Sequence, residues 1–306
     1  MSVQTLNQDF PVGGQVRYRT DDSGLVFAEI DNAQARASLC LQGAHLSTWR
    51  PKSQAEPVVW LSPAAKFAPG KSIRGGAPVC WPWFGPHATH SAWPAHGYAR
   101  TTAWQLTGAA ALDSGTTQLR LMLAPNDATR AQWPADTPLE LTATIGEQLR
   151  LELATTHRGA QPVVIGEALH TYFAISDIAA IEVQGLDGCA YLDKVDGAAH
   201  KTQRGAVAFA GEVERVYLNT MADCVIVDAP WRRRIRVAKA GSRSTVLWTP
   251  WTEKAQKMGD FGPGRDGRGG WREMVCVETA NAADNVIELA PGERHEMSMT
   301  VSVEAL

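Results

Sequence analysis

Alternation of apolar and polar residues with a period of two dominates this sequence, and it restricts most of the chain to β structure. The clearest case runs over residues 139–145 and 149–154, where every second residue is apolar on both sides of a Gly146-Glu147 turn. Successive side chains of a strand point to opposite faces, so this pattern gives each segment one buried face. The two segments therefore predict a β-hairpin.

Similar runs recur along the whole chain, separated by turn residues. Further strands are predicted over 15–20, 24–32, 35–49, 58–61, 103–107, 117–123, 163–175, 180–183, 224–228, 233–238, 244–248, 274–279, 286–289 and 294–304. The only predicted helix is 126–132, with Asn126 as N-cap and Pro134 after its end. Many short strands of this kind indicate an all-β sandwich of large antiparallel sheets with few short helices, which we expect to be a single domain over residues 1–306.

Composition narrows the possible partners. A net charge of −3 disfavours nucleic acid and anionic membranes, which call for clustered positive charge. Neither a leader-like beginning nor an apolar stretch of about 20 residues is present, so we expect no secretion signal and no membrane span. The five cysteines are scattered without a C-x-x-C pair, which predicts buried free thiols in a reduced, cytoplasmic compartment. Nothing in the sequence demands an oligomer, and we expect a monomer.

Residues 71–100 form the longest irregular stretch. Two adjacent glycines and four prolines exclude a long helix there, and the tryptophans argue against disorder. A long ordered loop in a compact domain is usually functional. We therefore interpret this stretch as one wall of a binding site, with rings for flat surfaces and His and Arg for polar or anionic groups.

Several familiar chemistries lack their motifs. No G-x-S-x-G elbow and no phosphate-binding glycine loop is found. His87, His90, His96 and Cys80 could suggest a metal, but they lack the short paired spacing of ligands on a rigid element. We expect no metal and no organic cofactor.

Two residues stand out inside apolar β segments, His170 and Glu278. A lone histidine in such a place is more often a satisfied core residue than a catalyst. A buried glutamate is costly unless it is paired, so a structural ion pair and an acid–base role are both open from the residues alone.

The motifs SIRGGAPVCWPWFGP, PAHGYAR, ALHTYF, ERVYLN and VCVETAN occur in an order and spacing that resembles the hexose-6-phosphate mutarotases. These form the glucose-6-phosphate 1-epimerase branch of the aldose 1-epimerase superfamily, and the resemblance covers roughly residues 36–300. It implies a galactose mutarotase-like β-supersandwich that uses neither metal nor cofactor.

The resemblance also implies roles for individual residues. His170 in ALHTYF and Glu278 in CVET match the catalytic pair of the family. The substrate-binding positions, including those for the phosphate, are matched by Arg74, His96, Arg100 and Glu214, the last standing where the family usually has aspartate. The position before the His96-Gly97 pair is Ala95, where some relatives have glutamine, so a contact from that position is missing.

The implied reaction exchanges the α and β anomers of a hexose 6-phosphate, most simply glucose 6-phosphate. Glu278 would take the proton of the C1 hydroxyl while His170, as imidazolium, protonates the ring oxygen. Three rings of the irregular stretch are equally open to sugar stacking or to wall packing, namely Trp81, Trp83 and Phe84.

Three alternatives are weighed against this function. An aldose 1-epimerase acting on free sugars would have no phosphate for Arg74 and Arg100 to neutralise. A carbohydrate-binding or sensing protein would not need both His170 and Glu278. A glycoside hydrolase would need a second carboxylic acid, and strand alternation points the nearest candidate, Glu167, away from His170.

Overall fold

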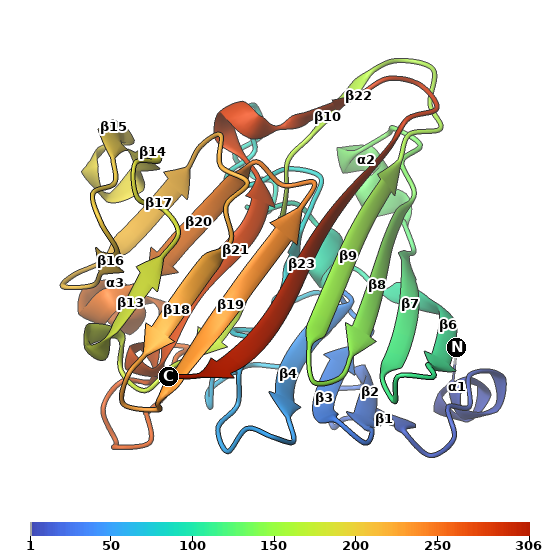
Figure 1. Ribbon diagram of the computed structural model, residues 1–306. Coiled ribbons are helices and arrows are strands. Elements are labelled where there is room, and N and C mark those ends of the chain that lie inside the picture. The colour runs from blue at the N-terminus through green and yellow to red at the C-terminus, as the bar shows by residue number, and fades with distance from the viewer. Residues whose placement is uncertain (1) are drawn as a thin grey trace.

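The computed structural model describes residues 2–306, which fold mainly into antiparallel β-sheets (Figure 1). The larger of the two main sheets has nine strands and spans the width of the molecule in Figure 1. In spatial order its strands are β16 (Val207–Ala208), β13 (Ile181–Gln184), β18 (Cys224–Asp228), β19 (Arg233–Ala240), β23 (Arg294–Ala305), β9 (Leu149–Thr156), β8 (Leu139–Ile145), β7 (Thr117–Leu123) and β6 (Trp104–Ala111).

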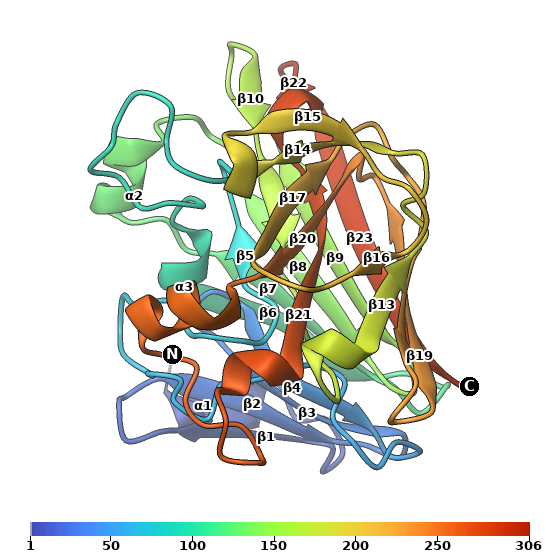
Figure 2. The same ribbon diagram turned by 90° about the vertical axis from the view of Figure 1, so that its left-hand side faces the viewer.

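The second main sheet has eight strands and lies against the first, as Figure 2 shows. Its order is β15 (Ala199–Thr202), β14 (Ala190–Asp193), β17 (Val213–Tyr217), β20 (Ser244–Thr249), β21 (Met274–Asn281), β11 (Glu167–Leu169) and β5 (Val79–Cys80), and β12 (Tyr172–Ala174) also pairs with β21. One continuous core contains side chains from both sheets, such as Leu151 of β9 and Val277 of β21. Burial between two sheets accounts for the alternation in the sequence.

Two smaller sheets complete the strand structure. A four-stranded meander, at the bottom of Figure 1, consists of β1 (Val16–Thr20), β2 (Val26–Asp31), β3 (Ala35–Cys40) and β4 (His45–Pro51). A two-stranded ribbon joins β10 (Val163–Ile165) to β22 (Ile287–Leu289). The all-β prediction and the 139–154 hairpin are therefore confirmed, the latter as β8 and β9.

The prediction of a single helix is wrong. The helix at 126–132 is present as α2 (Asp127–Gln132) with Asn126 as its N-cap, but α1 (Val3–Asp9) and α3 (Trp251–Met258) occur as well. Each of these two helices buries one residue, Leu6 or Ala255, so neither produces an apolar periodicity that sequence inspection can detect. Single 3-10 turns are η1 (Ala99–Thr101), η2 (Ile178–Ala180), η3 (Lys194–Asp196), η4 (Gly270–Glu273) and η5 (Ala283–Asn285).

Other predictions need local correction. The segment 163–175 is three short strands, β10, β11 and β12, and 58–61 forms isolated bridges at Val59 and Leu61 in place of a strand. The basic run at 232–236 lies largely on β19, where Arg234 and Arg236 are exposed, whereas Arg233 is buried and donates hydrogen bonds to the carbonyls of Pro57 and Ala174. No helix among residues 2–306 is long and apolar enough to cross a membrane.

Candidate active site

His170 and Glu278 are brought together by the pairing of short strands with β21. His170 lies between β11 and β12, and both strands pair with β21, which carries Glu278. Leu169 is opposite Thr279 and Tyr172 is opposite Cys276, so His170 falls beside Glu278. The His170 Nε2 and Glu278 Oε1 atoms are 3.3 Å apart, and the two residues are 8% and 1% exposed.

Burial shifts both pKa values of this pair toward the neutral forms. The pKa of Glu278 is raised well above its usual value, first by burial and then by the charge of Glu214, against the opposing charge of Arg100. The pKa of His170 is lowered well below its usual value, first by burial and then by the neighbouring side chains of His96 and Arg100. Glu278 Oε2 has no hydrogen-bond partner among residues 2–306. Such shifts are typical of groups that transfer protons.

The irregular stretch 71–100 supplies His96 beside this pair. Its ring lies 5.8 Å from that of His170, between centroids, and contacts Phe84 edge-on at 4.8 Å. His96 has a φ of 66°, a left-handed conformation that is strained for a residue other than glycine. The pKa of His96 is lowered to about 3 by burial and by the charge of Arg100, so this ring is a neutral hydrogen-bonding group.

The segment that carries His96 can pack closely against Trp81 because residue 97 is glycine. A Cβ at Gly97 would lie 1.9 Å from the carbonyl oxygen of Trp81, with which Gly97 forms a parallel bridge. Any side chain there would push the segment that carries His96 away from β5. The prediction that 71–100 is ordered and almost free of regular structure is confirmed, since it contains only β5 and the start of η1.

Arg100 is a cation for which residues 2–306 provide no acidic partner. Its Nη2 donates to the carbonyl of Ala95 at 2.9 Å, and no carboxylate of residues 2–306 lies within 4.0 Å of its guanidinium. Its charge nevertheless lowers the pKa values of Glu278, His170 and His96. Arg100 is therefore close to the reacting pair and electrostatically available to an anion.

Arg74, in contrast, is already paired. Its Nε donates to both carboxylate oxygens of Asp260, at 3.0 and 3.1 Å, and its Nη1 donates to the hydroxyl of Tyr172 at 2.8 Å. The guanidinium also lies over the ring of Phe261 at 5.0 Å. The Nη2 group takes part in none of these hydrogen bonds, so it remains a donor for a ligand.

Glu214 lies on β17, opposite Trp248 of β20. Its Oε2 is 2.7 Å from Nζ of Lys254 on α3, which also binds Glu212 at 2.8 Å. Because the charge of Glu214 raises the pKa of Glu278, the two carboxylates belong to one site. The structure thus brings the other four residues singled out in the sequence around the His170–Glu278 pair.

The three candidate stacking rings differ in access. Trp81 is 1% exposed, packs against Tyr98 and Trp133, and donates its indole N–H to Thr155, so it is a wall residue. Trp83 and Phe84 are half-buried. Only these two rings are open to a ligand.

Three residues of the site escaped the sequence reasoning: Tyr172, Lys254 and Asp260. Tyr172 lies within the ALHTYF motif, two residues from His170, and a strand alternation argument could have placed it on the same face. Lys254 lies on the unpredicted helix α3, and Asp260 follows it in a glycine-rich loop without periodicity. No sequence signal identified either of them.

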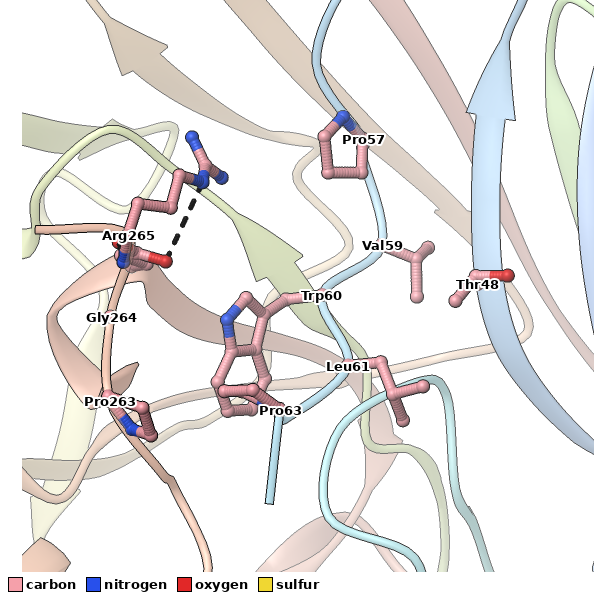
Figure 3. Close-up of a pocket in the computed structure, with 10 residues that line it drawn as sticks. Thr48, Pro57, Val59, Trp60, Leu61, Pro63, Pro263, Gly264 and Arg265 are labelled. Atoms are coloured by element: carbon pink, nitrogen blue, oxygen red, sulfur yellow. Dashed lines mark hydrogen bonds and ion pairs between the residues drawn. The ribbon is translucent and has the colours of Figure 1, made fainter. Parts of the chain in front are cut away.

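A separate cavity of about 520 Å³ lies between residues 57–63 and the loop at 263–265 (Figure 3). Most of its lining is apolar, including Pro57, Val59, Trp60 and Leu61. None of the six predicted residues contributes to it, and its charged groups Arg265 and Glu273 pair with each other at 3.7 Å. The cavity offers no acid–base pair, so the candidate active site is at His170 and Glu278.

No group of three or more His, Cys, Asp or Glu side chains that could hold a metal ion occurs among residues 2–306. The four cysteines at 40, 80, 224 and 276 are buried free thiols, as expected, and Cys189 is a half-buried one.

Comparison with known proteins points to one family. The family model described as aldose 1-epimerase matches residues 27–302. A protein of Salmonella typhimurium provisionally named glucose-6-phosphate 1-epimerase is 38% identical over 267 residues, which is 87% of this chain and 86% of the relative. A protein of Escherichia coli K12 with the same provisional name is 37% identical over 269 residues, 88% of this chain and 86% of the relative.

Solved structures agree with this relationship. A crystal structure from Salmonella typhimurium, provisionally described as a mutarotase, superimposes over 100% of both chains with a TM-score of 0.87 and 33% identity. A galactose mutarotase-like protein from Clostridium acetobutylicum shares only 10% identity but has a TM-score of 0.71 over 95% of this chain and 98% of its own. At such low identity, the second likeness shows the fold alone.

Proposed function

Because the chain belongs to the aldose 1-epimerase family, we propose that it is an isomerase that interconverts the α and β anomers of a hexose 6-phosphate, most simply D-glucose 6-phosphate. The observation that carries this proposal is the buried contact of 3.3 Å between His170 Nε2 and Glu278 Oε1. Beside it lies Arg100, a cation with no acidic partner among the described residues.

The pKa directions support a pair that holds one proton in total. A raised pKa at Glu278 and a lowered pKa at His170 favour one shared proton over none or two. This proton has two placements, glutamate with imidazolium, and glutamic acid with neutral imidazole. The two placements differ only by a proton transfer.

Anomer exchange uses both placements in turn. In the first, the Glu278 carboxylate removes the proton of the C1 hydroxyl while the His170 imidazolium protonates the ring oxygen, and the C1–O5 bond breaks to give the aldehyde. The pair is then glutamic acid and neutral imidazole, the placement that burial favours. Rotation about C1–C2 and reclosure on the other face reverse both transfers. Each positioned group contributes typically about 10²–10⁴ in rate.

The remaining residues bind and orient the sugar phosphate. We assign Arg100 and the free Nη2 of Arg74 to the phosphate end, since a guanidinium pairs well with phosphate oxygens. His96 is a neutral partner for a sugar hydroxyl. Glu214, restrained by Lys254, is an acceptor for further hydroxyls.

An aldose 1-epimerase acting on free sugars is the second candidate. The observation in its favour is the ion pair between Arg74 and Asp260. Asp260 neutralises the charge of one of the two arginines that we assign to the phosphate. Arg100 favours the phosphate, since an unpaired cation beside a neutral sugar would have no counter-charge.

Exchange NMR on the two substrates separates these candidates. The rates of α/β exchange are measured for glucose 6-phosphate and for glucose at matched enzyme concentrations. We expect kcat/KM to be at least about 100-fold higher for the phosphate, which corresponds to two charge-assisted hydrogen bonds. Equal values would refute the phosphate assignment while leaving the epimerase assignment intact.

We also infer a cytoplasmic location. The support is chemical: all five thiols are free, and four of them are buried.

A further inference from the structure

Tyr172 makes contacts with two functional groups at once. Its hydroxyl accepts a hydrogen bond from Nη1 of Arg74 at 2.8 Å. Its ring is stacked on the imidazole of His170, with 5.0 Å between centroids and 18° between planes. Tyr172 is 3% exposed, so solvent competes with neither contact.

We propose that Tyr172 is a positioning residue that links the substrate-binding guanidinium of Arg74 to the proton-transferring imidazole of His170. The proposal rests on the function proposed above, and it adds a residue through which the binding and chemical parts of the site are held in one geometry. Tyr172 itself transfers no proton in this account.

The hydroxyl orients Arg74. The guanidinium is held at Nε by Asp260 and at Nη1 by Tyr172, and two hydrogen bonds in different directions restrict the rotation of this planar group. With both anchors in place, the orientation of the third nitrogen, Nη2, is restricted as well. Loss of the hydroxyl leaves Arg74 free to turn about its contact with Asp260.

The ring orients His170. A histidine ring that must receive and give a proton at Nε2 has to keep that atom toward Glu278 and the sugar, 3.3 Å from Oε1. The parallel ring of Tyr172 restricts rotation of the imidazole about its Cβ–Cγ bond. Tyr172 is in turn stacked on Trp60 at 6.0 Å and 23°, and its backbone is bonded to Gly76 and Trp60.

Ordinary core packing would explain burial of the ring but not the hydroxyl bond. The change that separates the two is Tyr172→Phe, because it removes only the oxygen and keeps the stack. Tyr18→Phe is the matched control, since Tyr18 is equally buried, at 2%, and lies on β1 of the small four-stranded meander. Among the described residues, its hydroxyl donates only to the carbonyl of Phe10.

The test measures kcat and KM for glucose 6-phosphate by exchange NMR in the full-length chain. We expect Tyr172→Phe to raise KM about 10-fold with kcat within about threefold, consistent with the loss of one bond to a charged group. Asp260→Asn, which weakens the other anchor, should change KM in the same direction. Tyr172→Leu, which removes the ring, should lower kcat at least about 10-fold, since a misplaced acid transfers protons slowly. Tyr18→Phe should change neither constant.

Wild-type exchange is the first readout. If the wild-type chain does not accelerate exchange, the proposed function fails and the proposal falls with it. If the wild-type chain is active and Tyr172→Phe has the wild-type KM, the proposal alone is refuted. Should Tyr172→Leu fail to fold by circular dichroism, the KM values of Tyr172→Phe and Asp260→Asn decide the outcome.

Discussion

Two histidine–glutamate pairs involve residues within or directly after β11, and they differ in nearly every physical respect. The first is His170 with Glu278. The second joins Glu167 of β11 to His295 of β23, with His295 Nε2 and Glu167 Oε1 2.9 Å apart. Glu167 lies only three residues before His170, so neighbouring positions of the chain contribute to two pairs of the same composition.

The difference begins with the direction of the side chains. Glu167 is opposite Asn281 in the sheet register, whereas Glu278 is three residues earlier on the same strand. Because alternate residues face opposite sides, Glu167 points toward the nine-stranded sheet and binds a histidine of that sheet. The Glu167–His295 pair therefore cross-links the two large sheets.

The hydrogen-bond environment differs as well. Glu167 Oε1 also accepts a hydrogen bond from Asn281 Nδ2 at 2.9 Å. Burial alone would lower the pKa of His295, but the hydrogen bond and charge of Glu167 outweigh it and the pKa is raised. At the candidate active site burial prevails, and the pKa values of His170 and Glu278 move toward the neutral forms. A histidine and a glutamate in contact do not by themselves make a catalytic pair. At Glu167 and His295, hydrogen bonds and charge favour the charged forms. At His170 and Glu278, fewer such partners are present, so burial favours a pair that shares one proton.

The largest expected effect is on catalytic activity, and it is tested by replacing the glutamate of each pair with glutamine. Glu278→Gln should lower kcat for anomer exchange at least about 10³-fold, because it removes the base that takes the C1 hydroxyl proton. Glu167→Gln should leave kcat within about threefold. Exchange NMR measures both, with circular dichroism to verify folding. An active Glu278→Gln variant, at more than a tenth of the wild-type rate, would remove Glu278 from the chemistry.

For stability, we expect the Glu167 variant to be the damaging one and the Glu278 variant to be tolerated. Glu167→Gln should lower the free energy of unfolding by about 3 kcal/mol, because the substitution removes the buried carboxylate that pairs with His295. Glu278→Gln should raise that free energy by about 1 kcal/mol, since a neutral amide avoids the cost of either burying a carboxylate or protonating it at this pH. Urea unfolding at pH 7.5 provides both values. Equal losses in the two variants would mean that both glutamates are structural.

The contrast between the two pairs also shows what the sequence could predict. The alternation of 139–154 depends only on local burial, so β8 and β9 appear in the structure where the pattern predicts them. The same alternation separates Glu167 from His170, which excludes Glu167 as the second carboxylic acid of a hydrolase. His170 and Glu278 were found because they are polar residues in apolar strands.

What could not be predicted depends on contacts between distant segments. His295 approaches Glu167 from the other sheet, and Asp260 approaches Arg74 across 186 positions of sequence. Lys254 reaches Glu214 from a helix that buries only Ala255 and so has no apolar stripe. The partners of a charged residue follow from register and sheet packing, which a single sequence does not encode in any local pattern.

The smallest expected effect is a pH dependence that belongs to one pair only. His295 has a raised pKa in the folded state, so its protonation stabilises the fold. This stabilisation is complete below the unfolded value of about 6.5 and is lost as the pH rises through the folded value. The difference in unfolding free energy between wild type and His295→Gln should therefore be larger at pH 5.5 than at pH 9, and smaller at either pH than the effect of Glu167→Gln.

Urea unfolding of both proteins between pH 5.5 and pH 9 measures this difference. The matched control is His200→Gln, at an exposed position on β15. A difference that grew with pH would show that His295 is buried as a neutral ring, and the two pairs would then be electrostatically alike.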